Sequence, residues 1–187
     1  MRLFIAIDVP KNISERIVQV QKILSSTGAE LNFTKPENLH VTLKFLGEVN
    51  ENLINKIKNE IKEVAKCFHV FRMDVSGIGY FGSKNFIKVI WADISSGREI
   101  IIKMIEMLEK RLNTIRKNEH NPAPHLTIAR VKSGKNRDLL VNEINKLKNV
   151  KFGEVNVKEI KLKKSVLTPS GPIYQDIECF PLVDVNE

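Results

Sequence analysis

The chain repeats itself at an offset of 85 residues, and this repeat restricts the possible folds more than any other feature. The segment "HVTL" at 40–43 recurs as "HLTI" at 125–128, so the offset is 125 − 40 = 85. The same shift places "FIAID" at 4–8 on "VIWAD" at 89–93, and no gap is needed anywhere. Two units with one common order of elements predict two lobes related by a pseudo-twofold axis. In that arrangement the two histidine-bearing strands can face one another across a cleft.

Hydrophobic periodicity predicts a strand, helix, strand, helix, strand order within each unit. Short alternating or continuous apolar runs indicate strands, and apolar residues three or four positions apart indicate helices. Strands are predicted at 2–8, 31–34, 40–47, 68–81, 86–94, 124–131, 152–167 and 173–183. Helices are predicted at 12–26, 51–65, 98–115 and 137–149, and a turn at 168–172.

Length and charge narrow the class of protein. With 187 residues, the chain can form one domain with its own hydrophobic core, or two closely packed lobes. Its 30 Lys and Arg against 22 Asp and Glu give a net charge of +8, which favours an anionic partner such as nucleic acid or phosphate. Most single lysines are expected on solvated helix faces.

Two further features bear on the cellular compartment. Cys67 and Cys179 have no neighbouring Cys or His at metal-ligand spacing, so we expect reduced, mostly buried thiols. The apolar N-terminal segment meets Asp8 and Pro10 too early for a signal peptide or a membrane-spanning helix. We therefore expect a cytoplasmic protein with no membrane association.

The strand that begins at His40 has a polar face and an apolar face. Side chains alternate along a strand, so strict alternation places His40, Thr42 and Lys44 together on the polar face. A single histidine on a strand is more often structural than catalytic, and His-x-Thr alone is a weak pattern. Its recurrence as His125 and Thr127, in register with every other element, favours a shared functional role.

Two histidines that face one cleft suit a concerted acid–base reaction. A neutral imidazole takes a proton from the nucleophile, and a protonated one gives a proton to the leaving group. Threonine hydroxyls can donate hydrogen bonds to the non-bridging oxygens of a phosphate. A phosphodiester fits this arrangement, because its attacking and leaving oxygens lie on opposite sides of phosphorus.

The remaining histidines give no sign of a metal centre. His69 and His120 have no partners at ligand spacing, so we interpret both as surface or structural residues. We predict no metal site and no cofactor.

The residues around the two motifs resemble a known family. The segments that carry the resemblance are "FIAIDVP", "PENLHVTLKFLGEV", "VIWADI", "PHLTIARV" and "LTPSGPIY". With the paired His-x-Thr motifs, they resemble the 2H phosphoesterase superfamily, and within it the archaeal and bacterial RNA 2',3'-cyclic phosphodiesterases, historically called 2'-5' RNA ligases. The resemblance covers nearly the whole chain. It implies a bilobal α+β fold, formed by residues 1–187 as a single domain, in which two antiparallel β-sheets line a central cleft and helices pack outside.

The resemblance also implies an activity. It is the metal-independent opening of a terminal 2',3'-cyclic phosphate of RNA to a 2'-phosphate, together with reversible 2'-5' ligation of RNA ends. On the family pattern, His40 donates a proton to the leaving O3' and His125 is the base that activates water. Thr42 and Thr127 then contact the phosphate. The expected partner is RNA with 2',3'-cyclic phosphate ends, such as tRNA fragments, and the expected state is a monomer.

Two cations are candidate ligands of the terminal phosphate. Arg130 falls where the family often has a substrate-binding arginine, and a guanidinium suits this anion. Strict alternation turns Arg130 away from His125, so a bulge or a strand end at Ala129 must turn it inward. Lys44 shares the His40 face and can serve either the same anion or only the rim of the cleft.

Several aromatic and rim positions have more than one interpretation. Phe4 and Trp91 can stack a base, but both lie in apolar strand runs, which favours core packing. Family members often have Trp and Arg where this chain has Phe33 and Lys164, so no substrate contact is assigned there. Substrate choice is expected to depend on cleft-rim loops such as 80–86 and 131–137.

Three alternatives share part of this pattern. The same chemistry can act on 2'-5' linked oligonucleotides or on a small cyclic nucleotide. A non-catalytic RNA-end-binding protein would also be basic, but binding alone does not require two titrating imidazoles. A structural protein with an architectural repeat would have the symmetry but no reason to repeat the polar pair.

Overall fold

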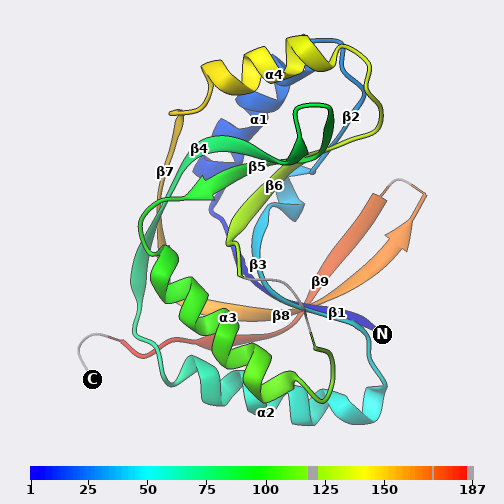
Figure 1. The fold of residues 1–187 in the computed structure, drawn as a ribbon. Coiled ribbons are helices and arrows are strands. Elements are labelled where there is room, and N and C mark those ends of the chain that lie inside the picture. The colour runs from blue at the N-terminus through cyan, green and yellow to red at the C-terminus, as the bar shows by residue number, and fades with distance from the viewer. Residues whose placement is uncertain (118–121, 170, 185–187) are drawn as a thin grey trace.

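The computed structural model of the protein describes residues 1–117, 122–169 and 171–184. The helices in these ranges are α1 (Lys11–Ser25), α2 (Ile54–Ala65), α3 (Arg98–Leu112) and α4 (Arg137–Lys146), with short 3₁₀ turns at Pro36–Asn38 and Glu51–Leu53. Figure 1 shows α1 and α4 together at one end of a curved sheet, and α2 and α3 together at the other end. The order of helices along the chain that was predicted from the sequence is therefore confirmed.

The strands form one antiparallel sheet in the order β7-β4-β5-β6-β3-β1-β8-β9, and β2 pairs with β6 beside this path. Their bounds are β1 (Arg2–Asp8), β2 (Leu31–Phe33), β3 (His40–Glu48), β4 (Phe71–Ser83), β5 (Phe86–Ile94), β6 (His125–Val131), β7 (Lys151–Val157), β8 (Glu159–Thr168) and β9 (Gly171–Pro181). The two halves of the sheet meet at β3 and β6, where the pair Val41 and Leu126 joins them. The two predicted sheets are thus continuous through one narrow junction.

Strands that the 85-residue offset relates occupy matching places on the two sides of this junction. β3 matches β6, β1 matches β5, and β8 matches β4. The third strand of each sequence unit is exchanged, because β4 pairs with β5 of the second unit and β8 pairs with β1 of the first. Because of this exchange, each half of the sheet contains strands from both halves of the sequence.

The single strand predicted at 152–167 is wrong in one respect, because it is two strands that end up far apart in the sheet. β7 pairs with β4, whereas β8 pairs with β1 and β9. The break at Lys158 has a signal in the pattern of burial. Just before Lys158 the buried residues are odd-numbered, as in Val155 and Val157, and just after it they are even-numbered, as in Ile160 and Leu162. An apolar face cannot stay on one side of a strand across such a change.

The core lies between the outer face of the sheet and the helices. Helix α1 contributes Ile13, Ile17 and Leu24, and each is fully buried. The prediction of mostly buried thiols is wrong: Cys67 and Cys179 are free and exposed. Cys67 lies just after the end of α2, and Cys179 lies on β9 at the edge of the sheet, so neither reaches this core. In the described part of the chain, no helix has the length and hydropathy needed to cross a bilayer.

Candidate active site

Both motif histidines stand at the first position of a strand, on the two strands where the halves of the sheet meet. His40 begins β3 and His125 begins β6. The two strands are antiparallel and pair at Val41 and Leu126. Counting one residue either way from that pair places His40 across from Thr127, and Thr42 across from His125. Each imidazole therefore stands opposite the hydroxyl of the other motif.

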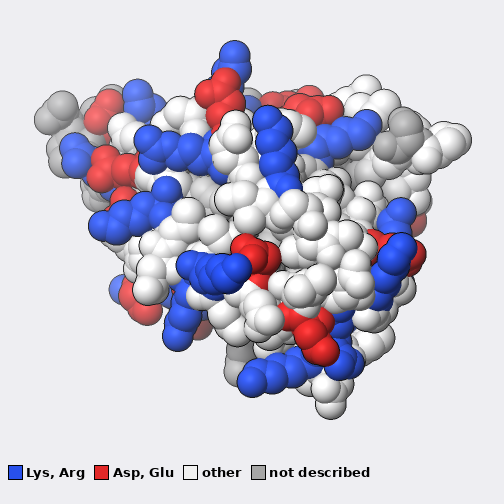
Figure 2. Space-filling view, turned by 90° about the horizontal axis from the view of Figure 1, so that it is seen from above, with Lys and Arg blue, Asp and Glu red and all other residues white. Residues whose placement is uncertain are grey.

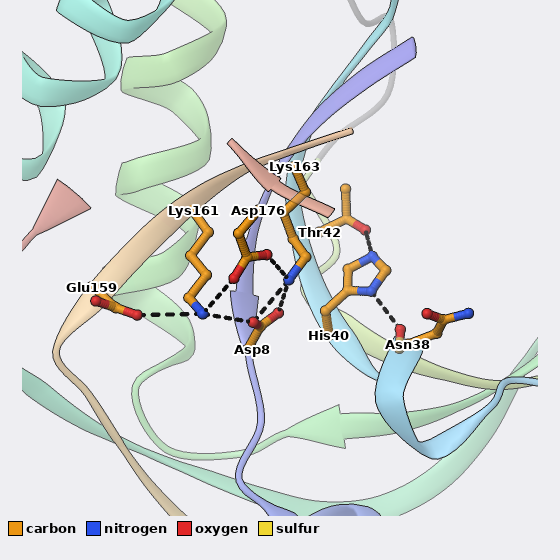
Figure 3. Close-up of polar contacts among 8 residues, drawn as sticks. All are labelled: Asp8, Asn38, His40, Thr42, Glu159, Lys161, Lys163 and Asp176. Atoms are coloured by element: carbon orange, nitrogen blue, oxygen red, sulfur yellow. Dashed lines mark hydrogen bonds and ion pairs between the residues drawn. The ribbon is translucent and has the colours of Figure 1, made fainter. Parts of the chain in front are cut away.

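Equivalent hydrogen bonds to backbone carbonyls fix the tautomers of the His40 and His125 rings. Nδ1 of His40 lies 2.7 Å from the carbonyl oxygen of Asn38, and Nδ1 of His125 lies 2.6 Å from that of Ala123. A carbonyl oxygen only accepts, so Nδ1 carries the hydrogen in each ring and Nε2 is the nitrogen that titrates. Nε2 of His40 lies 3.0 Å from Oγ1 of Thr42 (Figure 3).

A bulge follows each His-x-Thr motif at the equivalent position. Along β1 and β3 the pairing passes from Thr42 to Lys44, and along β5 and β6 it passes from Thr127 to Ala129. The skipped residues, 43 and 128, differ by the same 85-residue offset. A bulge reverses the parity of the residues after it. The sequence required either a bulge or a strand end at Ala129 if Arg130 was to reach the cleft, and the structure has a bulge, between Thr127 and Ala129.

The two bulges decide which cations reach the cleft. Arg130 is exposed and lines the cleft cavity, as does Phe45, its counterpart in the first motif. Lys44 turns the other way and is only 1% exposed, with its Nζ 2.6 Å from Oε2 of Glu109 on α3. The expectation that Lys44 shares the face of His40 is therefore wrong.

A cavity of about 360 Å³ lies in front of the two motifs. Four of the five predicted site residues line it: His40, Thr42, Thr127 and Arg130. The fifth, His125, stands next to it, opposite Thr42 in the strand register. Phe33 also lines this cavity. Lys164 lies on β8, paired with Leu3 and Gln175, and the cavity wall near it is formed by Ser165 and Leu167.

Aromatic rings pack against His40. The ring of Phe4 lies 5.0 Å from its imidazole, and that of Tyr174 lies 5.3 Å away and edge-on. Phe4 is nearly buried, so it combines the core packing that the sequence favours with a contact to His40. Tyr174 was missed by sequence reasoning. The only feature of the sequence that pointed to Tyr174 was its place in the segment "LTPSGPIY". The β8–β9 hairpin formed by this part of the chain is what brings Tyr174 to His40.

A different pair of rings lies beside His125. Phe81 on β4 meets the imidazole edge-on at 4.9 Å, and Trp91 lies 5.5 Å from Phe81. Trp91 also covers Gly79, where an added Cβ would lie 2.3 Å from the indole ring. Packing of Trp91 against the sheet is thus the role that its contacts support. These contacts help fix the orientation of the imidazole.

Each histidine also stands opposite an aspartate. Asp8 on β1 pairs with His40, and Asp93 on β5 pairs with His125, again at an offset of 85 residues. Burial lowers the pKa of His40, while the Asn38 carbonyl and Asp8 raise it in part. Burial also lowers the pKa of His125.

The charges around His40 form a network that is drawn in Figure 3. Lys163 is buried, and its Nζ lies 2.8 Å from each carboxylate oxygen of Asp8 and 2.6 Å from Oδ1 of Asp176. Lys161 bridges the same two carboxylates at 3.1 and 2.9 Å, and Glu159 at 3.5 Å. Three carboxylates and two ammonium groups leave this network with a net charge of −1.

The charges around His125 have the opposite balance. Arg98 holds Asp93 at 2.6 Å, and both Arg98 and Arg130 lower the pKa of His125. One carboxylate and two guanidinium groups give a net charge of +1. Negative surroundings favour an imidazolium and positive surroundings favour a neutral imidazole. The balance of charge around the two imidazoles therefore differs in sign, although burial lowers the pKa of both.

His69, the other histidine that the structure describes, does not join the site. His69 is exposed and forms an isolated bridge with Val183, and His120 lies outside the described residues. Within the ranges that the structure describes, no group of three or more His, Cys, Asp or Glu is arranged to hold a metal ion.

The family profile described as LigT-like phosphoesterase matches residues 7–91 and 94–174, which include both motifs and Tyr174. The chain belongs to this family. A relative from Methanocaldococcus jannaschii is 40% identical over 179 residues, 95% of this chain and 99% of its own. One from Methanothermobacter thermautotrophicus is 35% identical over 184 residues, 97% and 99% of the two chains. Both relatives are named RNA 2',3'-cyclic phosphodiesterase.

Solved structures of other proteins share the fold. A crystal structure of a protein from Thermus thermophilus matches with a TM-score of 0.83 at 27% identity, over 99% of this chain and 100% of that one. E. coli LigT, solved with 3'-AMP, matches with a TM-score of 0.77 at 22% identity, over 97% of both chains. The predicted resemblance and the α+β fold class are confirmed.

Proposed function

We propose that the chain hydrolyses 2',3'-cyclic phosphate ends of RNA to 2'-phosphates, as a metal-independent phosphodiesterase with two catalytic histidines. The names of its full-length relatives support the substrate. The observation that carries the proposal is the crossed arrangement of the motifs, with each imidazole opposite the other motif's hydroxyl. A concerted displacement at phosphorus needs an acid and a base on opposite sides, and this arrangement supports the assignment of one histidine to each task.

The reaction follows from the two titrating Nε2 atoms. Neutral His125 takes a proton from water as the water oxygen bonds to phosphorus. The P–O3' bond breaks, and the imidazolium of His40 gives its proton to O3'. The product carries a 3'-hydroxyl and a 2'-phosphate. His40 ends neutral and His125 ends protonated, so one proton must return through solvent before the next turnover.

Three further residues are assigned to the phosphate. The hydroxyls of Thr42 and Thr127 donate to its non-bridging oxygens, where negative charge increases in the transition state. Arg130 lines the same cavity and offers a planar fork of donors to the same oxygens. The charges around the two histidines support the acid role of His40 and the base role of His125.

The remaining parts of the proposal concern the protein as a whole. We assign residues 1–187 to a single domain of two pseudo-symmetric halves that acts as a monomer on RNA ends, with tRNA fragments among its substrates. Cys67 and Cys179 are free and exposed, which suits the reducing cytoplasm. If the 5'-hydroxyl of a second RNA replaces water as nucleophile, the same steps give a 2'-5' linkage.

The test compares short RNAs that end in a 2',3'-cyclic phosphate, in a 3'-phosphate or in a 2'-5' linkage, each with and without EDTA. We expect the cyclic end to become a 2'-phosphate at a rate that EDTA leaves unchanged. A 3'-phosphate product would mean that O2' is the leaving oxygen. Turnover of the 2'-5' linkage alone would favour the alternative substrate, and binding without turnover would favour a non-catalytic RNA-end-binding protein.

A further inference from the structure

A second hollow of about 120 Å³ lies outside the cleft, between the β4–β5 hairpin and the segment that joins β6 to α4. Its floor is apolar and is formed by Ile87 and Leu140. Phe86, Lys132 and Arg137 are among the other residues that line it. The hollow therefore combines an aromatic ring with cations, which is the composition of a single-stranded nucleic-acid site.

Residues that line this hollow follow directly, along the chain, on the β6 residues that line the cleft cavity. Arg130 is the last β6 residue to line the cleft cavity, and Val131 and Lys132 line the hollow directly after it. A strand rises about 3.3 Å per residue, so Lys132 lies about 7 Å along the chain from Arg130. A chain bound by its end at Arg130 can reach Lys132 with its next phosphate. Figure 1 shows the β4–β5 hairpin and α4 at this same end of the sheet.

The segment that forms one wall is held in place before any ligand binds. The backbone N–H of Lys132 donates to the carbonyl of Glu30 at 2.8 Å. Nδ2 of Asn136 donates to the carbonyl of Thr27 at 3.0 Å, and Asn136 takes a left-handed conformation with φ of 52°. These anchors come from the end of α1 and the approach to β2. A wall fixed in this way binds at a smaller entropic cost than a free loop.

The side chains that face the hollow are available to a ligand. Phe86 is 65% exposed, although it is a large apolar residue, and Lys88 lies 5.5 Å from its ring centre. Among the described residues, Lys132 forms no ion pair, and Arg137 pairs with Asp138, whose side chain is 86% exposed. Figure 2 views the molecule from this end and shows Lys and Arg side chains spread among acidic ones over the face. The cations here are thus individual contacts and not one uniform basic patch.

We propose that this hollow is an upstream site for the RNA segment that precedes the cyclic phosphate. Lys132, Ser133 and Arg137 hold a backbone phosphate, and the exposed ring of Phe86 stacks a base. A cyclic phosphate closes the 3' end, so the chain can leave the cleft only in the 5' direction. The inference rests on the proposed function and deepens it, because it makes an RNA chain, and not a free cyclic nucleotide, the preferred substrate.

The test compares cytidine 2',3'-cyclic phosphate with a short single-stranded RNA that carries the same terminal nucleotide. The variants are Lys132→Ala/Arg137→Ala and Phe86→Ser. The control is Lys103→Ala/Lys110→Ala, which removes two exposed cations from α3 in the other half of the molecule. We expect the wild type to prefer the RNA. Each upstream variant should lower kcat/KM for the RNA about tenfold and leave that for the mononucleotide unchanged.

Salt dependence separates phosphate contacts from a general loss of charge. For single strands, each phosphate contact contributes about −0.7 to the slope of log affinity against log salt. We expect Lys132→Ala/Arg137→Ala, which remove the contacts to one phosphate, to make the slope for RNA shallower by about 0.7, and the α3 control to leave it unchanged. Equal kcat/KM for both substrates in the wild type, or equal losses on both in the variants, would overturn the upstream site alone. A wild type that turns over neither substrate would instead overturn the proposed function.

Discussion

Asp8 lies directly opposite His40 on the neighbouring strand, with its carboxylate held by two lysines. Its negative charge raises the pKa of His40 against the dominant effect of burial. The other charged groups near this imidazole are Lys163 on β8 and His125 on β6, and both lower its pKa. Asp8 is therefore the side chain that most favours a protonated His40, and it acts through the field and not through a hydrogen bond to the ring.

We expect Asp8→Asn to move the alkaline limb of the pH profile of kcat/KM to lower pH. Removing the carboxylate lowers the pKa of His40 further. An acid works only while protonated, so its activity is lost as pH rises through its pKa, and a lower pKa brings that loss to lower pH. Turnover of an RNA with a 2',3'-cyclic phosphate end, measured from mildly acidic to mildly alkaline pH, checks this shift.

Asp93→Asn is the matched variant at the other histidine. It lowers the pKa of His125, and a base works only while neutral, so the acidic limb should move to lower pH instead. The limbs belong to the coupled pair, so the variants are compared with each other and not with single pKa values. If Asp8→Asn moved the acidic limb and Asp93→Asn the alkaline limb, the two catalytic roles would be the reverse of those proposed.

His40→Ala and His125→Ala should each lower kcat by about 10² to 10⁴-fold, the usual contribution of one general acid or base. Thr42→Ala and Thr127→Ala should cost less, because each removes one neutral donor and leaves acid and base in place. Circular dichroism and thermal unfolding provide the control for folding. Near-wild-type turnover by either histidine variant would contradict the two-histidine mechanism.

Arg130→Ala and Lys44→Ala should impair different properties of the protein, substrate binding and stability respectively, because the bulges place these two cations on opposite faces of the sheet. Arg130→Ala should raise KM with little change in stability, since its side chain is exposed in the cleft. Lys44→Ala removes a buried ammonium from its ion pair with Glu109, which should cost about 2 kcal/mol of unfolding free energy. KM and denaturant midpoints measured on both variants separate the effects. A larger rise in KM for Lys44→Ala would place that lysine, and not Arg130, near the phosphate.

Much of the fold and of the candidate site could be predicted from local pattern and from the repeat. Each predicted helix appears, and so does each predicted strand except the one at 152–167, which is two strands; periodicity succeeds because it reports which face of an element is buried. The repeat related His40 to His125 because the two units keep one register. These signals lie within short segments or at one constant offset.

The features that sequence reasoning missed depend on parity and on distant contacts. A bulge changes which face Lys44 occupies, and its partner Glu109 lies on a helix of the other sequence unit. At Lys158 the buried positions change from odd-numbered to even-numbered residues, and the apolar residues on either side of this change resemble one alternating strand. Tyr174 reaches His40 only because β8 and β9 fold back beside β1. Tertiary structure decides such contacts, and no single segment contains them.

We expect the lysine pair beside the active site to make stability fall in acid, and Asp176→Asn to weaken this dependence. Burial alone would raise the pKa of Asp176, but hydrogen bonds from Lys163 and Lys161 lower it below its ordinary 3.8. A carboxylate with a lowered pKa in the folded state contributes stability that is fully present above its unfolded pKa, and this contribution is lost as pH falls through the folded value. Below about pH 4 the wild type should therefore lose unfolding free energy more steeply than Asp176→Asn does.

Urea unfolding at a series of acidic pH values measures this difference in slope. The control places Asp176→Asn in a Lys163→Met background, where the carboxylate has already lost one of its two ammonium partners. There the substitution should change the slope less than it does in the wild type. If the plots of unfolding free energy against pH were parallel for the wild type and Asp176→Asn, solvent screening at this partly exposed carboxylate would cancel the effect of the lysines. The network would then not contribute to the stability of the fold.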